Sequence, residues 1–591
     1  MPIHHDDDIL EARIAASGDI QDILGLLQKT SHENAYRPQS PFFLTFDNPR
    51  PSEVKNNMEN PTRRVFLAAS AGAVAARVSF AQTPSDLCSL TLKQAADGIR
   101  AKKFSAVDLT EACLDSIKTW NPKINAWITV MREKALAQAK TLAGEQAKGQ
   151  IRGPLHGIPI GIKDSIDTAG VRTTAASAVY EYRFPSEDAE VIRRLKAAGA
   201  VIVGKCNMHE FDAGASSAVS YWGPVRNPWN LERIAGGPSG GSAAAVAMCN
   251  CFAALGTDSG GGIRIPASDC GVTGLKATYG GVSLRGIVPF AWSLDHCGPL
   301  ARSAEDAALV LQQIAGYDHL DIDSVDKPVP DFTAALSAPV AQFRIGIAAQ
   351  FYDHLDDDVA KAVEEALAVL HKLTKGSHEV GLPPLLHANV TAEIAAYHEN
   401  LRGVNGGGYE ASTARVFPSG QDASRAVDYI RGWRDLTMVR RTVDEEVFGK
   451  QMVDVLVAPV VRHVPALIEE ALIPAGGGGG RGGGGGAAGG GGDGRGGAGG
   501  NSGARAVQDD DDNTRPFNGY GLPAISIPCG FSKEGLPIGL QIAGPMFGEA
   551  NVLAVASAFQ RETDWHRKKP GLQLDTKVPM LSKNASEQTG G

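Results

Sequence analysis

The chain has 591 residues, 43% of them hydrophobic and 21% charged, and its formal net charge is −9. This composition is typical of an ordinary soluble globular protein, and the length allows one large domain or several smaller ones. The acidic balance argues against general nucleic-acid binders and proteins of anionic membrane surfaces, because both carry a basic excess.

Residues 1–57 are polar and rich in turn formers, which predicts a disordered extension. A His-His-Asp-Asp-Asp run at residues 4–8 is interpreted as solvated tail, with metal binding by His4 and His5 as the weaker alternative. The segment that follows has the pattern of an export signal, and such signals begin near the start of a chain. Either translation begins at Met58 or the extension is a long leader, and the sequence leaves both open.

Residues 58–81 are predicted to be a twin-arginine export signal. Arg63 and Arg64 precede an Ala/Gly-rich apolar stretch, and a Ser-Phe-Ala triplet ending at Ala81 supplies the small residues of a cleavage site. The stretch is too short to span a membrane, and Arg77 interrupts it. We therefore expect a periplasmic or secreted protein without a stable membrane anchor after cleavage. If the signal is unused, the alternatives are an amphipathic helix and a cytoplasmic protein.

The body of the protein reads as alternating helices and strands. Residues 91–147 show helical spacing, with Ser105 as the predicted N-cap of one helix. The apolar runs 159–162 and 201–204, each bounded by Gly or Pro, predict buried strands. Between them, residues 188–199 predict an amphipathic helix that ends at glycine. This alternation indicates an α/β architecture with helices on both faces of a sheet.

The eight cysteines form no C-x-x-C pair and show no histidine spacing that suits a zinc site. We expect buried free thiols, and the predicted export leaves a disulfide as the alternative. The cysteines are Cys88, Cys113, Cys206, Cys249, Cys251, Cys270, Cys297 and Cys529.

A second unusual segment covers residues 476–512. It is almost pure glycine as far as residue 503 and ends in four aspartates at 509–512. Such a segment buries too little apolar surface to offset the entropy of ordering, so we predict a disordered insertion. Its RGG-like triplets at Arg481 and Arg495 are a weak indication of RNA binding, which the predicted export disfavours. The aspartates lack the spaced pattern of a calcium site.

Three motifs carry the functional information. A lysine, Lys163, lies in the otherwise apolar loop GIPIGIKD, and two glycine-rich loops follow at Gly236–Ser242 (GGPSGGS) and Gly256–Arg264 (GTDSGGGIR). Together they resemble the amidase signature family, whose members cleave carbon–nitrogen amide bonds with a Lys–Ser–Ser relay. The resemblance implies catalysis without a metal ion or organic cofactor.

The resemblance extends from about Leu90 to Trp565 and is densest over residues 153–306. It implies one domain over residues 87–566, interrupted by the insertion at 476–512 and followed by a polar tail, 567–591. The implied fold is α/β: a large, mixed, twisted central sheet covered by helices on both faces.

The resemblance assigns roles at the centre of the site. Lys163 matches the family's lysine, which acts as a neutral base because burial lowers a lysine's pKa. Its structural alternative is an ion pair with Asp164 or another acid. Pro238 stands at the bridging serine and Gly262 at the nucleophilic serine, so both relay hydroxyls are lost. The Gly237-Pro238 bond can adopt the cis form that the family has here, because proline lowers its cost.

Other residues of the two loops receive supporting roles. Backbone N–H groups of the loop Ser259, Gly260, Gly261 and Gly262 are the expected oxyanion hole. Asp258 and Arg264 bracket that loop and are expected to pair.

Ser239 and Ser259 are the two hydroxyls that can substitute for the lost ones. The family already places a supporting hydrogen bonder at the position of Ser239 and commonly threonine at that of Ser259, so both are explained without a catalytic role.

Several other polar residues are interpreted as structural. Near-neighbours in sequence cannot converge as a triad, which excludes that role for Ser293, Asp295 and His296. His156 and His209 are expected to make structural hydrogen bonds. Cys206 and Cys270 have no basic neighbour in sequence that would create a reactive thiolate.

The resulting expectation is an amidase-family protein that is impaired or inactive, with a small amide as possible ligand and no nucleic-acid partner. One alternative is an active amidase that uses Ser239, Ser259 or water. A further alternative is the glutaminase-type subunit of a tRNA-dependent amidotransferase, which the predicted export disfavours. The amide and the oligomeric state stay open.

Overall fold

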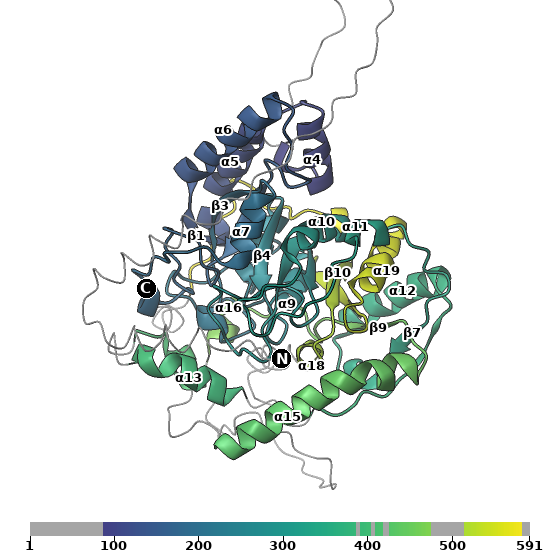
Figure 1. Ribbon diagram of the computed structural model, residues 1–591. Helices are drawn as coiled ribbons and strands as arrows, with labels where there is room; N and C mark the ends of the chain where they lie inside the picture. Colours follow the sequence, from purple (N-terminus) through teal and green to yellow (C-terminus); the bar gives the residue numbers. More distant parts are fainter. Residues whose placement is uncertain (1–86, 386–389, 403–407, 418–424, 474–512, 582–591) are drawn as a thin grey trace, which may run out of the picture. The chain divides into compact units, whose positions relative to one another are not determined.

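A large mixed sheet runs through the computed structural model, with helices packed along it (Figure 1). The predicted extension at 1–57, the export signal at 58–81 and the insertion at 476–512 lie outside the part of the chain that the structure describes. The described residues are 87–385, 390–402, 408–417, 425–473 and 513–581.

Within the described ranges the sheet has eleven strands in the order β1-β3-β2-β4-β6-β5-β10-β11-β9-β7-β8. β2 is parallel to β3 and β4, and β7 is parallel to β8 and β9, while the other neighbouring pairs are antiparallel. The strands are β1 (Trp127–Val130), β2 (Pro159–Lys163), β3 (Val201–Cys206), β4 (Ala253–Thr257), β5 (Thr273–Lys276), β6 (Cys297–Ala301), β7 (Ile345–Ile347), β8 (Ser377–Glu379), β9 (Val455–Pro459), β10 (Ala524–Phe531) and β11 (Pro537–Ala543).

The α-helices of the described chain are α4 (Leu92–Arg100), α5 (Ala106–Ile124), α6 (Arg132–Ala147), α7 (Glu190–Ala197), α8 (Gly240–Ala247), α9 (Arg264–Cys270), α10 (Ala304–Ile314), α11 (Phe332–Ala335), α12 (Asp357–Leu373), α13 (Thr391–Arg402), α14 (Ala411–Val416), α15 (Ala426–Val443), α16 (Ile468–Leu472), α18 (Arg515–Gly519) and α19 (Glu549–Glu562).

The helices form two layers over the sheet. α8 and α9 pack on each other, α8 against β4 and α9 against β5, β10 and β11. α10, α12 and α19 form a second group, and α19 also packs against β10 and β11. α5 and α6 lie together beside β3, near one edge of the sheet, and α12 lies toward the other edge (Figure 1). The predicted α/β fold with helices on both faces is therefore confirmed.

The local predictions agree with the structure in their main points. Ser105 caps α5 in a reciprocal capping box with Asp108, which satisfies two otherwise unpaired donors of the helix start. The predicted helix at 188–199 appears as α7, and the two predicted strands appear as β2 and β3. All eight cysteines are free and buried, as expected.

Two local predictions need correction. Residues 91–147 are not helical throughout, because the sheet's edge strand β1 lies between α5 and α6 and pairs with β3. Lys163 lies not in a loop but at the last position of β2, where pairing with β3 continues to the register Lys163–Cys206.

The end of the described chain packs on earlier elements. Lys123 Nζ, on α5, donates to Thr576 O at 2.5 Å, and Arg226 Nη2 donates to Pro579 O at 2.9 Å. The first part of the predicted polar tail is thus held by backbone carbonyl contacts. No helix among the described residues is both long and apolar enough to cross a bilayer.

Candidate active site

Two parallel strands bring the central side chains together. β2 ends at Lys163 and its neighbour β4 ends at Thr257, with Ile162 in register with Leu255. The carboxyl ends of parallel strands meet at one edge of a sheet, and this is the usual place of a site in an open α/β sheet. Both strands are fully buried and nearly all apolar, and Lys163 is the one charged side chain that these two strands carry.

Lys163 is held by a carboxylate and a hydroxyl. Its Nζ forms a buried ion pair with Asp212 and donates to Thr257 Oγ1 at 2.6 Å, and Thr257 Oγ1 donates to Asp212 Oδ2 at 3.2 Å. Burial lowers the pKa of Lys163, and the Asp212 carboxylate opposes that shift. Burial likewise raises the pKa of Asp212 against the opposing effect of Lys163. Each charge is thus stabilised chiefly by the other.

The acid that pairs with Lys163 comes from a tight turn distant in sequence. Asp212 ends the turn Glu210–Asp212, in which Phe211 and Asp212 have φ angles of 47° and 63°. Non-glycine residues rarely adopt these angles. Asp164, the acid next to Lys163 in sequence, instead accepts hydrogen bonds from Thr174. The structural alternative foreseen for Lys163 therefore occurs, with another acid as its partner.

The first glycine-rich loop places Pro238 against Gly262. The Gly237-Pro238 peptide bond is cis. A Cβ atom added at Gly262 would lie 2.7 and 2.8 Å from Cδ and Cγ of Pro238 and 2.5 Å from Thr257 O. Real Cβ atoms essentially never approach other atoms so closely. The pyrrolidine ring and the Thr257 carbonyl oxygen together fill the space in which a side chain at 262 would begin.

The second loop is fixed by a fully buried ion pair. Arg264 donates from Nη2 to Asp258 Oδ1 at 2.8 Å and from Nε to Asp258 Oδ2 at 3.0 Å. Its remaining donors bond Gln541, Asn518 and the Thr514 carbonyl. Burial alone would raise the pKa of Asp258, but Arg264 outweighs it and holds that pKa well below its usual range. The bidentate contact fixes the shape of the loop.

Not every N–H of the expected oxyanion hole is open to a ligand. Gly261 N donates to Asp258 Oδ1 at 2.8 Å, so Gly261 departs from the predicted role because its donor is already engaged. The backbone N–H groups of Ser259, Gly260 and Gly262 stay as candidates.

The two serines named as substitutes lie in different settings. Ser239 is fully buried and links the loops: its Oγ donates to Thr257 O and accepts from Thr257 N, both at 3.2 Å. Ser259 is partly exposed and donates to Asp295 Oδ1 at 2.5 Å. Burial raises the pKa of Asp295 to about 7, despite the hydrogen bonds that the carboxylate accepts. Ser259 thus has a carboxylate partner and access to solvent.

Ser293, Asp295 and His296 do not converge, as expected. Ser293 Oγ donates to Glu393 at 3.1 Å, and His296 Nδ1 lies 2.7 Å from the carbonyl oxygen of Leu294. Burial lowers the pKa of His296 well below its usual value. Each of the three side chains therefore has a separate partner.

The remaining residues that the sequence singled out have structural contacts. His156 Nε2 lies 3.0 Å from the Leu142 carbonyl oxygen, and His209 Nδ1 lies 3.4 Å from Ser216 Oγ. Burial, together with Lys163, lowers the pKa of His209 to about 3. Burial raises the pKa of the Cys206 and Cys270 thiols well above their usual value, which disfavours thiolates there.

Sequence reasoning missed Asp212 and Thr257, and it gave Asp295 no role. Asp212 and Thr257 lie inside segments that resemble the family, but nothing in their spacing indicates contact with Lys163. Two further buried lysines, Lys205 and Lys276, also escaped notice. Both bond backbone carbonyl groups, and burial lowers the pKa of Lys205 to about 8.

The Lys163 centre is nearly closed. Lys163 is fully buried, and partial exposure at Pro238, Ser259 and Gly260 marks where a ligand can approach. Two cavities in the described chain lie elsewhere and are not lined by these residues. No group of three or more His, Cys, Asp or Glu in the described ranges is placed to hold a metal ion.

Comparison with known proteins gives consistent matches. The family model described as Amidase matches residues 108–474 and 500–553. The glutamyl-tRNA(Gln) amidotransferase A-subunit of Geobacter sp. (strain M21) is 39% identical over 514 residues, covering 82% of this chain and all of the relative.

Solved structures match over similar lengths. The glutamyl-tRNA(Gln) amidotransferase A-subunit of Thermotoga maritima has a TM-score of 0.63 and 32% identity, over 81% of this chain and 96% of that one. A 6-aminohexanoate cyclic dimer hydrolase in complex with its substrate has a TM-score of 0.70 and 27% identity, over 82% and 99%.

Proposed function

The chain belongs to the amidase signature family of hydrolases, and on that premise we propose that it is an exported member in which the lysine–serine–serine relay no longer operates. The observation that carries this proposal is the packing of the Pro238 ring on Gly262. Neither residue has a relay hydroxyl, and the ring, together with the Thr257 carbonyl oxygen, also fills the space that a nucleophile at 262 would need.

The chemistry of the reaction explains why these losses matter. Amide cleavage needs a nucleophile that loses a proton as it attacks, and a donor that protonates the leaving nitrogen. Lys163 Nζ donates hydrogen bonds to the side chains of Asp212 and Thr257 and, within the described residues, to no other side chain. In a serine protease, loss of the nucleophile lowered kcat about 10⁶-fold. We expect a comparable loss here.

In this proposal the protein still binds the carbonyl group of an amide. The N–H groups of Ser259, Gly260 and Gly262 belong to a loop that the Asp258–Arg264 pair keeps in shape. Preorganised N–H donors of this kind hold a carbonyl oxygen without forming a covalent bond. The expected ligand is therefore a small carboxamide that is bound but turned over slowly.

A second candidate function is hydrolysis through Ser259. Ser259 Oγ attacks the amide carbonyl and gives its proton to Asp295; the carbon–nitrogen bond then breaks and the leaving amine takes that proton. Water finally hydrolyses the acyl-serine. The 2.5 Å hydrogen bond and the partial exposure of Ser259 favour this candidate over one that uses the buried Ser239.

A third candidate follows from the names of the relatives. Several are subunits of glutamyl-tRNA(Gln) amidotransferase, so the role of a glutaminase in such a complex is an alternative for this chain. The export pattern at residues 58–81 disfavours it, because partners and tRNA would be cytoplasmic. The chain could be isolated from the cytoplasm of the cells that naturally produce it. Co-purification with further amidotransferase subunits would support the glutaminase role over that of an exported protein with an inoperative relay.

The deciding experiment restores both serines. The double variant Pro238→Ser/Gly262→Ser and the unaltered protein are assayed on a panel of aryl and acyl carboxamides, with each single variant as a matched control. We expect turnover in the double variant only. Hydrolysis at ordinary rates by the unaltered protein, abolished by Ser259→Ala but not by Ser239→Ala, would replace the proposal with the second candidate.

The export part of the proposal has its own test. Residues 1–86 are fused to a reporter that folds in the cytoplasm, and Arg63 and Arg64 are changed to lysine in a control fusion. We expect the reporter outside the cytoplasm with the unaltered segment and inside with the control. Cytoplasmic reporter in both fusions would contradict export.

A further inference from the structure

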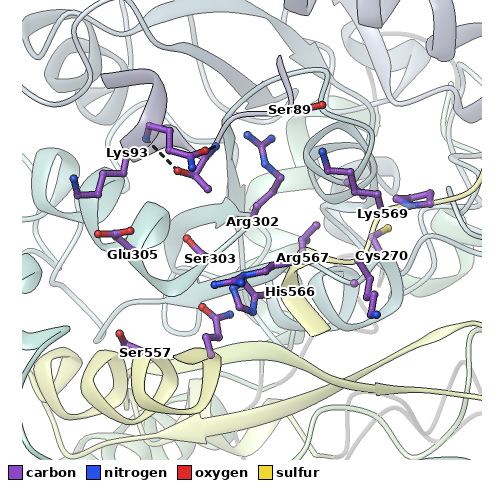
Figure 2. A pocket seen from close by; sticks show the side chains of 18 of the residues that line it. Ser89, Lys93, Cys270, Arg302, Ser303, Glu305, Ser557, His566, Arg567 and Lys569 are labelled. Carbon is purple, nitrogen blue, oxygen red and sulfur yellow. Dashed lines mark hydrogen bonds between the residues drawn. The ribbon is translucent and has the colours of Figure 1, made fainter. Parts of the chain in front are cut away.

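A cavity of about 440 Å³ lies between the starts of α4 and α10, the end of α19 and the segment 566–570 (Figure 2). Its volume is in the range of small-molecule sites. The end of α9, at Cys270, also lines it. None of its lining residues belongs to the Lys163 centre.

The lining of this cavity is strongly basic in an otherwise acidic chain. Six lysine and arginine residues face two acids, Asp97 and Glu305, whereas the whole chain has a net charge of −9. A concave site lined by one sign of charge concentrates ions of the opposite sign. The basic residues are Lys93, Arg302, Arg561, Arg567, Lys568 and Lys569.

Four of these cations already have partners. Lys93 pairs with Asp97 at 2.6 Å, and Lys568 pairs with Asp564 at 3.4 Å. Arg302 donates to the carbonyl oxygens of Leu90 and Cys251.

Arg561 donates to Leu336 O at 2.7 Å and to Ser557 Oγ at 2.8 Å. Both acceptors are neutral oxygens, so within the described ranges the charge of Arg561 is not compensated by an acid. The charge of Arg302 is partly offset by the buried carboxylate of Asp306.

Arg567 and Lys569 differ from the other four. Within the described ranges neither forms an ion pair, and both are exposed. Figure 2 shows Arg567 beside His566 in the middle of the cavity, with Lys569 on the side of Cys270. These two cations are the ones that can reach a ligand.

His566 adds an independent observation. Its Nδ1 is buried and has no hydrogen-bond partner among the described residues. Buried polar atoms are nearly always paired, so such an atom in a cavity calls for an explanation. The burial of His566, helped by Arg567, lowers its pKa to about 4, so the ring is neutral at pH 7. A bound molecule with a polar edge would satisfy Nδ1.

We propose that this cavity binds a small molecule bearing a phosphate group, with Arg567 and Lys569 as its charged contacts. Arginine and lysine together suit phosphate oxygens, because the guanidinium offers a fork of donors and the ammonium a compact charge. An excess of uncompensated cations favours a multivalent anion over a monovalent carboxylate. Trp229, which also lines the cavity, supplies an aromatic wall for the rest of the molecule.

Inorganic pyrophosphate is the probe. It is titrated into the full chain by calorimetry at low salt, and into the double variant Arg567→Ala/Lys569→Ala. We expect saturable binding that weakens at least about tenfold in the double variant, since each hydrogen bond to a charged group contributes roughly that factor or more. Unchanged affinity in this variant would overturn the proposal.

The matched control removes the same charge elsewhere. Lys372→Ala/Lys375→Ala changes two exposed lysines around the end of α12 and should leave the affinity within about twofold. Equal weakening by both double variants would show nonspecific attraction and contradict a built site. Citrate that binds as tightly as pyrophosphate would contradict the phosphate assignment. Far-UV circular dichroism and thermal unfolding confirm that the variants are folded.

Discussion

At the scale of single residues, Pro238 and Gly262 act as one unit. A serine at 262 clashes with the proline ring, whereas the ring packs without conflict on glycine. The consequences of changing one of them therefore depend on the other, as is usual for residues in direct contact.

This dependence gives a prediction about stability. Gly262→Ser alone should lower the free energy of unfolding by about 1–3 kcal/mol, the usual cost of overpacking. Adding Pro238→Ser should recover part of that loss, because the ring atoms that the new Cβ meets are gone. Urea unfolding of the two single variants and the double variant measures the coupling. Strictly additive effects would contradict direct contact between these residues.

Asp295 makes stability depend on pH. Its pKa is raised from about 4 to about 7 in the folded state, so between these values the folded state holds a proton that the unfolded state has lost. The contribution of Asp295 to stability therefore falls as pH rises from about 4 to about 7.

Asp295→Asn should remove this contribution. We expect a shallower fall in the free energy of unfolding over that range, measured by urea unfolding at several pH values. Glu210, whose pKa burial also raises to about 7, contributes in the same direction and persists in the variant. An identical pH profile in both proteins would mean that Asp295 titrates normally.

At the scale of elements, regular periodicity predicted the structure well and local chemistry predicted some boundaries. Ser105 is recognisable as a cap because a hydroxyl before a helical pattern satisfies free N–H groups. The strand β1 was missed because four residues between two helices carry too short a pattern to distinguish. Its strand state comes from pairing with β3, a contact that the local sequence does not encode.

The cap of α5 is the element-scale prediction. Ser105→Ala should lower the free energy of unfolding by about 1 kcal/mol, because Asp108 N loses its acceptor. Thr119→Ala, at an exposed position on the same helix, is the matched control and should change it by less than about 0.5 kcal/mol. Equal effects of the two changes would contradict the capping role.

In the candidate site, too, contiguous motifs could be predicted from the sequence, whereas contacts between residues far apart in the chain could not. Lys163 and the two loops could be identified from sequence because each is a contiguous motif. Asp212 could not, because its approach to Lys163 depends on a turn with two positive φ angles and on the placement of β2 beside β3. The engagement of Gly261 by Asp258 depends in the same way on a folded loop.

At the scale of the whole molecule, the last described segment accepts hydrogen bonds from residues in the first half of the chain. Truncation after residue 570 removes the carbonyl acceptors of Lys123 and Arg226 and should lower the free energy of unfolding by about 1–3 kcal/mol. A chain that ends at Leu581 keeps both acceptors and is the control. Equal stability of the two truncated chains, measured by urea unfolding, would show that these hydrogen bonds contribute nothing to the free energy of unfolding.

The contact between Pro238 and Gly262 also limits which substitutions the second glycine-rich loop can accept. On the present backbone, a side chain at 262 would meet the proline ring and, closer still, the carbonyl oxygen of Thr257. A residue larger than glycine at 262 therefore requires the loop backbone to shift, whichever residue stands at 238. Replacing Pro238 removes only one of these two obstacles, so a new side chain at 262 is accommodated only when both glycine-rich loops adjust together.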